Sequence, residues 1–401
     1  MDPVHAQYEA YPYPARDPAE EATRLITGSP SAVHEIDHYL FAGQRDWRRP
    51  LRALVAGGGT GDGLIQLAQG LADLNCPAEL VYLDLSTAAR EIAEARAAAR
   101  SLTNITFLTG DLTDPPDGPF DYIDCCGVLH HLPDPQVGFD ALARVLSPEG
   151  GMGIMVYAPY GRTGVYPLQE AFETLFAAEA PEARVAAARA ALETLPETNW
   201  FLRNAQLSDH RASDAGLFDL LLHARDAPFW IEDLDAALIA AGLQMVSPIE
   251  PARYDPARCL PATPQTAARL KALSPLARMG LAERLSGDLR MHIVYAAPAA
   301  RAKSAMAKPE PTAMPRLSGL PAAALAKTVA KQGGVDISYS GVKHRVEIPG
   351  RAAALISQIG GRALGDIAKA ARLDWFAFMQ LWGPVHRGLT GYNRLHYTRV
   401  R

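Results

Sequence analysis

The sequence has few cysteines, no long uncharged hydrophobic run and no strong excess of one charge. Its four cysteines, Cys76, Cys125, Cys126 and Cys259, are not spaced as a CxxC metal knuckle or a CxxxCxxC cluster site. We expect buried or reduced thiols, which favours a cytoplasmic protein. No segment approaches the roughly 18 apolar residues that a membrane helix needs. The first ten residues lack the basic-then-apolar pattern of a secretory signal, so we expect no association with a membrane.

The composition is typical of a globular protein, but the charge is unevenly distributed along the chain. It contains 401 residues, 48% hydrophobic and 21% charged, and a net charge of −5. At roughly 100–200 residues per domain, this length predicts two or three domains. Residues 318–401 carry twelve Lys and Arg against four Asp and Glu, which makes the segment +8 and leaves −13 for residues 1–317. A basic segment following an acidic body indicates a separate module with its own role.

Residues 51–157 alternate short β-like runs with helical patterns. Strands are expected at 52–56, 80–84, 105–109, 122–126 and 153–157. Leu64, Leu67 and Leu71 recur at helical spacing, and Asp134 followed by Pro135 has the form of an N-cap and first residue of a helix over 136–146. Such alternation predicts an α/β, doubly wound, Rossmann-like sheet that is mostly parallel and covered by helices on both faces.

The remaining segments give the expected organisation of the chain. A helix at 231–241 and strands at 243–247 and 291–296 would complete a sheet of seven strands. The predicted parts are an N-terminal helical cap or lid over 1–50, a core over 51–160, a helical insertion or substrate lid over 161–230, the rest of the sheet over 231–298, a polar, Pro-containing linker over 299–317, and the basic domain over 318–401.

A glycine-rich loop follows the first predicted strand and runs into a helix. Its residues are Gly57, Gly58, Gly59, Thr60 and Gly61. Glycines allow close approach of the backbone to a ligand, and exposed amides at a helix start favour an anionic group. The dinucleotide fingerprint GxGxxG fails in every frame, because its third glycine would fall on Asp62, Leu64 or Gln66. The loop therefore argues against a dehydrogenase.

Three further strand ends carry candidate ligand groups. The second strand ends in Asp84, whose carboxylate can accept hydrogen bonds from two ribose hydroxyls. The third leads into Gly110-Asp111-Leu112, which places another carboxylate at the same edge, and the fourth leads into Gly127. Each residue has a plainer interpretation: Asp84 as a helix N-cap, Asp111 as a turn residue, and each glycine as a turn former. Their occurrence in strand order favours one shared binding site.

With these motifs, residues 50–160 closely resemble the class I S-adenosylmethionine-dependent methyltransferases, and residues 161–298 resemble them more loosely. The resemblance implies that the glycine-rich loop, with Gly127 nearby, holds the methionine part of the cofactor, that Asp84 holds the ribose, and that Asp111, Leu85 and Leu112 frame the adenine. It implies S-adenosylmethionine as cofactor, S-adenosylhomocysteine as product and no metal. The family often has an acidic residue two positions before the first motif glycine, whereas this chain has Val55.

Candidate residues for the methyl acceptor follow the fourth and fifth strands. His130 and His131 lie beside the expected cofactor edge, in a His-Leu-Pro context that is common in the resembled family and often only positional. Tyr157 and Tyr160 follow the fifth strand, where tyrosines could line a pocket for a desolvated amine or simply pack at the sheet edge. Methyl transfer requires alignment and sometimes removal of a proton, so no fixed catalytic signature is expected.

The insertion and the N-terminus supply further candidates for lining the acceptor site or for a lid. Trp200 and His210 lie in an unusually polar part of the insertion, and His223 and Asp226 would share a helix face if the helix persisted, as a base and its orienting group. Such a pair also commonly anchors a lid. Near the N-terminus, Tyr11, Tyr13 and Arg16 form a stretch stiffened by prolines that either closes over the cofactor or packs on the surface.

The basic segment has a helix, a glycine turn, a second helix and a terminal strand, which predicts a small winged-helix-like domain. Such domains bind nucleic acid, but these arginines are scattered, and Trp375, Phe376 and Trp382 favour substrate presentation or homodimer formation. A looser resemblance to multi-domain bacterial protein methyltransferases favours a protein or peptide acceptor. The alternatives are an O- or N-methyltransferase of small molecules and a non-catalytic regulator that binds S-adenosylmethionine and nucleic acid.

Overall fold

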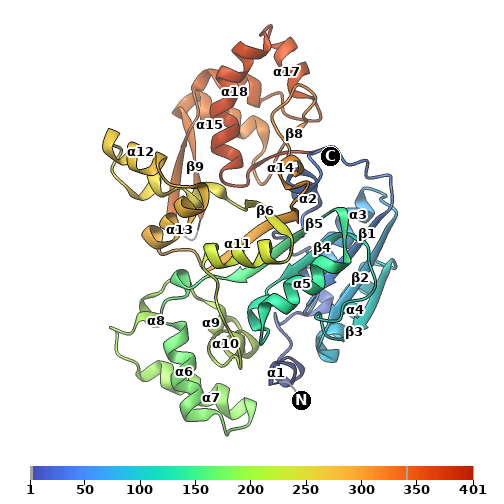
Figure 1. Ribbon diagram of the computed structural model, residues 1–401, viewed down its shortest axis with the longest axis vertical. Coiled ribbons are helices and arrows are strands. Elements are labelled where there is room, and N and C mark those ends of the chain that lie inside the picture. Colours follow the sequence, from blue (N-terminus) through green and yellow to red (C-terminus); the bar gives the residue numbers. More distant parts are fainter. Residues whose placement is uncertain (1–2, 340–341, 401) are drawn as a thin grey trace.

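A seven-stranded sheet forms the centre of the molecule (Figure 1). The computed structural model describes residues 3–339 and 342–400. The strand order is β3-β2-β1-β4-β5-β7-β6, and β7 runs antiparallel to both of its neighbours. The strands are β1 (Leu51–Ala56), β2 (Ala78–Asp84), β3 (Ile105–Thr109), β4 (Phe120–Cys126), β5 (Leu146–Tyr157), β6 (Leu243–Pro248) and β7 (Met291–Pro298). The predicted doubly wound α/β fold is confirmed.

Each predicted strand is present, and the apolar runs of the central strands are buried, as expected for a parallel sheet between helix layers. β1 is buried at every position except Arg52, and β4 runs through the buried residues Ile123 and Cys125. The parallel strands all end at one edge. That edge therefore collects the glycine-rich loop after β1, Asp84 at the end of β2, and the loops after β3 and β4.

Helices cover both faces of the sheet. The side chains of α2 (Val33–Leu40), α3 (Asp62–Asp73) and α4 (Thr87–Ala99) contribute to one apolar core. Those of α5 (Pro135–Val145) and α11 (Ile231–Ala240) contribute to the core on the opposite face. Asp134 caps α5, since its Oδ1 accepts a hydrogen bond from the amide of Gln136 at 3.0 Å, as the sequence predicts.

The insertion forms a helical region with its own small apolar core. It contains η3 (Tyr160–Arg162), α6 (Val165–Phe176), α7 (Pro181–Thr194), α8 (Trp200–Arg203), α9 (Asp209–Ala212) and α10 (Asp214–Leu221). Figure 1 shows these elements in green below the sheet, with the N-terminal helix α1 (Pro3–Ala10) beside α10. Because α10 ends at Leu221, the prediction that His223 and Asp226 share a helix face is wrong.

Four short helices lie between β6 and β7, and another lies near the N-terminus. They are η4 (Pro251–Tyr254), η5 (Pro256–Cys259), α12 (Pro264–Lys271), α13 (Pro275–Ser286) and, after α1, η1 (Pro18–Ala22). α13 packs on α11 and on η4 and η5, so this arm is attached to the face of the sheet that α11 covers. Figure 1 shows α12 and α13 projecting beside the C-terminal elements.

The C-terminal region is a separate apolar core built from helices and two strand pairs. It contains α15 (Ala322–Gln332), β9 (Gly334–Tyr339), β10 (Val342–Glu347), η6 (Gly350–Ala352), α16 (Ala353–Ile356), α17 (Leu364–Ala370), α18 (Trp375–Thr390) and β11 (Leu395–Tyr397). β9 pairs with β10, but β11 pairs with β8 (Pro315–Leu317). The predicted winged-helix arrangement is not confirmed, because the terminal strand pairs with a strand that precedes the module.

The segment 299–317, predicted as a linker, is packed against the sheet domain. It contains α14 (Ala302–Ala305) and β8, and Ala302, Ala305 and Ala313 are buried. Small alanine side chains let this segment pack closely against α2 and β7, a contact that a polar, Pro-containing composition does not reveal. The C-terminal region is thereby fixed to the sheet domain.

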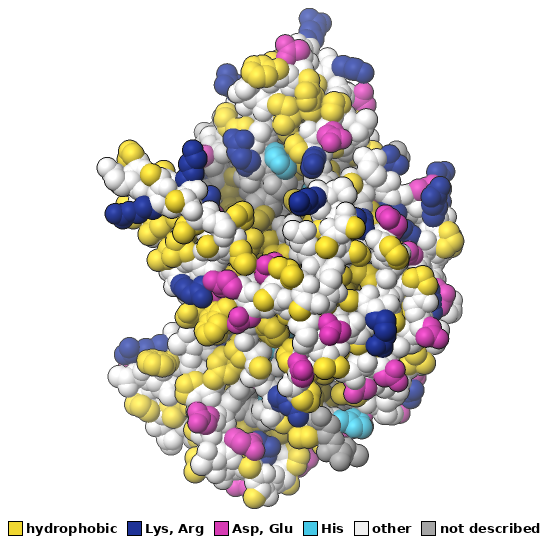
Figure 2. All heavy atoms as spheres, viewed as in Figure 1, with side chains coloured by type: hydrophobic (Ala, Val, Ile, Leu, Met, Phe, Trp, Pro, Cys, Tyr) yellow, Lys and Arg dark blue, Asp and Glu magenta, His cyan; other side chains and the backbone are white. Residues whose placement is uncertain are grey.

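The basic side chains of the C-terminal region do not form one stripe. Figure 2 shows Lys and Arg scattered among hydrophobic side chains on the visible face of this region. Arg345 pairs with Asp336 at 3.3 Å and with Glu347 at 3.2 Å. The predicted nucleic-acid partner and the predicted homodimer stay predictions.

Among residues 3–339 and 342–400, no helix combines the length and the apolar character needed to cross a membrane.

Candidate active site

A cavity of about 620 Å³ lies at the carboxyl edge of the sheet. The ends of β1, β2 and β4 form its floor, and α1 and the chain that follows it form one wall. The lining includes the predicted cofactor residues Gly57, Gly58, Gly59, Asp84, Leu85, Asp111, Leu112 and Gly127. These residues are up to 70 positions apart in the sequence, and the parallel strands bring them to one site. Thr60 and Gly61 lie behind the loop, outside the lining.

Two glycines show why the glycine-rich loop cannot carry side chains. Gly57 has φ +70°, and a Cβ atom there would lie 2.2 Å from Cγ2 of Val128. Gly61 has φ +100° and is the N-cap of α3, where a left-handed backbone favours glycine. Thr60 is fully buried, and its hydroxyl donates to the carbonyl of Pro14 at 2.7 Å. The loop therefore turns tightly at the cavity floor and is held from behind by the N-terminal segment.

Asp84 lies in the cavity as a hydrogen-bonded carboxylate. Its Oδ2 accepts from the amide of Gly59 at 2.8 Å, and its Oδ1 accepts from the amide of Ser86 at 2.9 Å. Ser86, whose Oγ accepts from Ala89, is the N-cap of α4, so Asp84 does not cap that helix. Burial raises the pKa of Asp84 above its usual value. Two backbone amides fix the carboxylate and leave lone pairs for hydroxyl groups of a ligand.

The residues expected to frame the adenine are an aspartate in a turn and two leucines that form an apolar wall. Oδ1 of Asp111 accepts from the amide of Thr113 at 2.8 Å, so the expected turn role is present, and the residue also lines the cavity. Leu85 and Leu112 line the same end. The structure thus places a carboxylate next to two aliphatic side chains, the combination that the sequence resemblance implies for an adenine.

The N-terminal segment closes one side of the cavity. Tyr13 and Pro14 line it, and Arg16 binds Asp62 of α3 through two hydrogen bonds, Nε to Oδ1 at 2.8 Å and Nη2 to Oδ2 at 2.6 Å. Tyr11 lies outside the lining and stacks on Phe218 of α10 at a centroid distance of 5.2 Å. Of the predicted N-terminal lid residues, Tyr13 therefore lines the cavity, whereas Tyr11 and Arg16 hold the segment in place from outside it.

A buried cluster of hydroxyls surrounds one carboxylate in the part of the cavity that Tyr8 and Tyr157 line, here called the acceptor end. Asp219 of α10 accepts from the hydroxyl of Tyr8 at 3.1 Å and from the hydroxyl of Tyr157 at 3.2 Å. His223 Nδ1 accepts from the amide of Arg225, so its Nε2 carries the proton and donates to the Tyr8 oxygen at 3.1 Å. Tyr8, Tyr157 and Asp219 all line the cavity.

The protonation states of this cluster follow from burial. Burial raises the pKa of Asp219 to about 6 and holds the pKa values of Tyr8 and Tyr157 well above their usual value. Burial lowers the pKa of His131 to about 4 and that of His223 well below its usual value. At neutral pH the cluster contains two phenols, two neutral imidazoles and one carboxylate.

Two of the remaining candidates support this cluster from outside the cavity. His130 is fully buried, and its Nδ1 accepts from the amide of Tyr157 at 3.3 Å. Asp226 binds Arg162 at 2.8 Å, and the guanidinium of Arg162 lies 3.7 Å from the centre of the Tyr157 ring. Both residues therefore fix the position of Tyr157.

The last three candidates lie away from the cavity. Tyr160 begins η3, Trp200 is 66% exposed on α8, and His210 contacts Phe201 at a centroid distance of 4.9 Å. Trp200 and His210 were predicted because the insertion is unusually polar, but Trp200 faces solvent and His210 packs on Phe201.

Sequence reasoning missed several cavity residues. Ser31, Asp62, Asp124 and Asp219 line the cavity, and none was predicted as a site residue. A signal was present for two of them: Asp124 interrupts the apolar run of a central strand, and Asp219 interrupts the run Leu217–Leu222. A carboxylate in an apolar run is costly to bury unless it has a partner, so it indicates a site.

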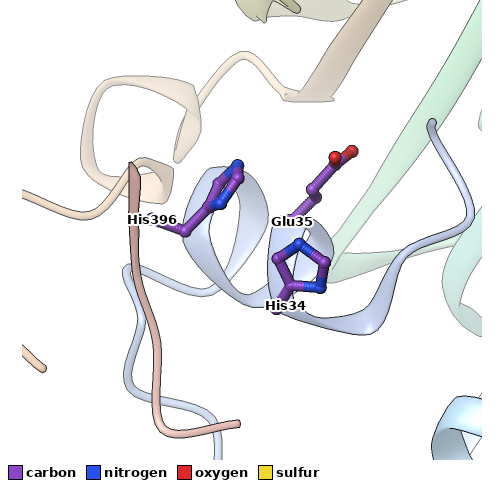
Figure 3. A group of neighbouring side chains, drawn as sticks. All are labelled: His34, Glu35 and His396. Atoms are coloured by element: carbon purple, nitrogen blue, oxygen red, sulfur yellow. The ribbon is translucent and has the colours of Figure 1, made fainter. Parts of the chain in front are cut away.

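Three groups of described residues have the composition of metal ligands, two of them beside His131. In the group made of His131, Asp219 and His223, both ring nitrogens of His223 already have hydrogen-bond partners. The third group, His34, Glu35 and His396, lies where α2 meets β11 (Figure 3). The Glu35 carboxylate has one oxygen within 4.8 Å of a nitrogen of each ring. It accepts from Asn393 at 2.7 Å and thereby joins the sheet domain to the C-terminal region.

Comparisons with known proteins agree with this geometry. Residues 54–152 match the family model described as a methyltransferase domain. An uncharacterized protein, syc1184_c of Synechococcus sp., is 31% identical over 300 residues, which cover 71% of this chain and 69% of that protein. PKMT2 from Rickettsia typhi has a similar fold, with a TM-score of 0.60 at 15% identity over 97% of this chain and 76% of PKMT2. Its structure in complex with AdoHcy gives a TM-score of 0.58 at 14% identity over 87% of this chain and 72% of PKMT2.

The sheet order, the glycine-rich loop below the cavity and the acidic ends of β2 and β3 agree with the matched family. This chain belongs to the class I S-adenosylmethionine-dependent methyltransferases.

Proposed function

We propose that this methyltransferase acts on an amine nitrogen carried by a side chain of a protein or peptide. The observation that carries the proposal is the carboxylate of Asp219, buried in the cavity between the hydroxyls of Tyr8 and Tyr157. A carboxylate beside aromatic rings attracts a cationic amine through charge and through the negative faces of the rings. The same negative charge disfavours a carboxylate acceptor.

The residues of the cavity fit S-adenosylmethionine. Asp84 offers free lone pairs beside the loop amides, Leu85 and Leu112 offer an apolar wall, and Gly57 leaves no side chain in the floor. When bound, the cofactor supplies a methyl group on a positively charged sulfur. The protein must then hold the acceptor in line and exclude water, which an enclosed, mostly apolar site favours.

Asp219 is the base best suited to neutral pH among the groups at this end. An alkyl ammonium must lose a proton before its nitrogen can attack. A base is most effective when its pKa lies near the working pH. Asp219, with a pKa of about 6, is closer to neutrality than His131, with a pKa of about 4. The histidines predicted as catalytic groups therefore serve as neutral hydrogen-bond partners in this proposal.

The proposed reaction transfers one proton and one methyl group. The acceptor ammonium gives one proton to Asp219, and the freed lone pair forms the new nitrogen–carbon bond. The carbon–sulfur bond breaks with its electron pair on sulfur, so S-adenosylhomocysteine and a methylated ammonium are formed. Asp219 returns its proton to solvent. Tyr8 and Tyr157 keep their protons throughout, because burial raises their pKa values, and they orient the carboxylate.

Two observations support an acceptor on a protein or peptide. The helical region and its surroundings expose large apolar side chains, among them Leu175, Trp200 and Trp230, and exposed apolar groups of this size are common where proteins bind one another. Figure 2 shows hydrophobic side chains along the hollow between the helical region and the arm that carries α12 and α13. The fold similarity to PKMT2 also extends over the helical and C-terminal regions, not only the sheet.

Two observations favour the alternative of a small-molecule amine. Val4 and Tyr8 of α1 line the cavity, so the acceptor end is covered by the N-terminal helix in this conformation. A cavity of about 620 Å³ also lies within the range of about 300–1,000 Å³ that is common for small-molecule sites.

The deciding experiment follows the labelled methyl group. The full chain is incubated with methyl-labelled S-adenosylmethionine and with separate protein and small-molecule fractions of a cell extract. We expect label in protein, released by acid hydrolysis as an N-methylated amino acid. Label only in the small-molecule fraction would support the alternative. Label recovered as a methyl ester or ether would refute the amine acceptor. A matched incubation with Asp219→Asn shows which product depends on the proposed base.

A further inference from the structure

Val55 and Asp124 are neighbours in the sheet. Val55 lies on β1, two positions before the first motif glycine, where the resembled family often has an acid. In the parallel pairing of β1 with β4, the residue opposite Val55 is Asp124. Paired residues on adjacent strands point to the same face, and both residues line the cavity. The carboxylate missing from β1 is therefore present one strand away.

Asp124 is a buried carboxylate without a cationic partner among the described residues. It is 1% exposed, and Oδ2 accepts from the hydroxyl of Ser31 at 2.6 Å. Burial raises its pKa to about 6, and hydrogen bonds from Ser31 and Tyr122 only partly oppose this effect. No ion pair in the described part of the chain includes Asp124. A buried charge in this condition lowers stability unless something else compensates it.

The space beside this carboxylate is kept open by Gly63 in the first turn of α3. A Cβ atom on Gly63 would lie 2.7 Å from Ser31 Oγ and 3.6 Å from Asp124 Oδ2. The amides at the start of α3 favour a negative group, and Asp124 on the other side favours a positive one. This corner of the cavity thus offers opposite charges to the two ends of an amino acid.

We propose that Asp124 binds the ammonium group of the methionine part of S-adenosylmethionine, in place of the β1 acid that Val55 replaces. The carboxylate reaches this position from β4, and Ser31 holds it through Oδ2. The ammonium of the ligand supplies the cation that the free protein lacks. This inference concerns the cofactor and does not depend on the identity of the methyl acceptor.

The test measures binding rather than turnover. Calorimetry compares two ligands on the full chain: S-adenosylhomocysteine, and an analogue in which hydrogen replaces its amino group. The wild-type protein should bind S-adenosylhomocysteine about ten- to a hundredfold more tightly, the range expected for a charge-assisted hydrogen bond. Asp124→Asn should bind S-adenosylhomocysteine that much more weakly and should bind both ligands about equally.

The analogue separates lost recognition from lost folding, because a misfolded variant binds neither ligand. Asp124→Ser is a second variant with the same expectation. Asp121→Asn, on the same strand but outside the cavity, is the matched control and should keep the wild-type preference. Asp84→Asn should weaken both ligands equally, since both retain the ribose. If Asp124→Asn prefers S-adenosylhomocysteine as strongly as the wild-type protein does, Asp124 does not bind the ammonium group.

The free protein gives an independent readout. If Asp124 carries an uncompensated charge until the cofactor binds, Asp124→Asn should melt at the same or a higher temperature than the wild-type protein at pH 7. S-adenosylhomocysteine should then raise its melting temperature less than that of the wild-type protein. An equal ligand-induced increase in both proteins would overturn the inference.

Discussion

Arg16 and Asp62 form a two-point hydrogen-bonded ion pair that joins the N-terminal segment to the start of α3. The same carboxylate accepts from Arg96, which is itself buried and bound to Glu21 at 2.7 Å. The pair lies directly behind the glycine-rich loop. It therefore connects the segment that covers the cavity to the loop that forms the cavity floor.

Arg16→Ala should speed the release of S-adenosylhomocysteine. Loss of a partly exposed ion pair weakens closure of the N-terminal segment, and we expect the dissociation rate to rise about two- to fivefold. Stopped-flow displacement measures this rate. Arg24→Ala, which removes an exposed pair with Glu20 in the same segment, is the control and should leave the rate unchanged. Equal rates for Arg16→Ala and the wild-type protein would show that the segment does not limit release.

Asp84→Ala should abolish most cofactor binding while the fold is retained. The substitution removes the acceptor for ribose hydroxyls and also leaves the amide of Gly59 without its partner. We expect the affinity for S-adenosylhomocysteine to fall by a factor of about 100 or more, since two hydrogen bonds to a charged group are lost. Calorimetry measures the affinity and circular dichroism the fold. Unchanged affinity would refute the ribose assignment.

The pH dependence of methyl transfer should reveal Asp219. Its pKa is raised to about 6 by burial, so the protonated, inactive form accumulates as the pH falls through 6, and kcat/KM should decline there. Asp219→Asn should lower kcat by about 100-fold or more. It should also remove the acidic decline and leave cofactor affinity unchanged.

Tyr157→Phe tests the role of Asp219 by removing one of its hydrogen-bond donors. The variant removes a hydroxyl that donates to the Asp219 carboxylate and favours its charged form. The pKa of Asp219 should therefore rise, and the acidic decline should move to higher pH. A profile identical to that of the wild-type protein would show that Asp219 does not control the rate.

The junction between α2 and the C-terminal region should contribute to stability. Asp37 is fully buried, and its Oδ2 accepts from the Thr398 hydroxyl at 2.7 Å and from the Arg399 amide at 3.0 Å. Thr398→Val removes one hydrogen-bond donor to this buried carboxylate and should lower the free energy of unfolding by about 1–3 kcal/mol. Thr328→Val, whose hydroxyl bonds to its own helix at the surface, should change it little. Denaturant titration compares the two variants.

The local pattern of the sequence determined the central sheet. Apolar runs such as β1, the glycines after it and the N-cap Asp134 depend on neighbours close in the chain, so the presence of these strands and the cofactor edge follow from them. The acid at position 84 was predicted in the same way, whereas the places of Leu85 and Leu112 were implied by the family resemblance. The packed segment around α14 was not predicted, because its burial depends on partners far away in the sequence. The hairpin β9–β10 was also missed, although its two strands are neighbours in the chain.

Only the tertiary structure decided which polar residues act together at the acceptor end. Asp219, Tyr8 and Tyr157 are separated by up to 211 positions, and α10 had to end before His223 for that ring to reach Tyr8. The role proposed for Asp124 likewise depends on the register that places it beside Val55. The physical reason is that burial and charge are properties of a site rather than of a segment. A carboxylate acquires its pKa and its partner from whatever the fold packs around it.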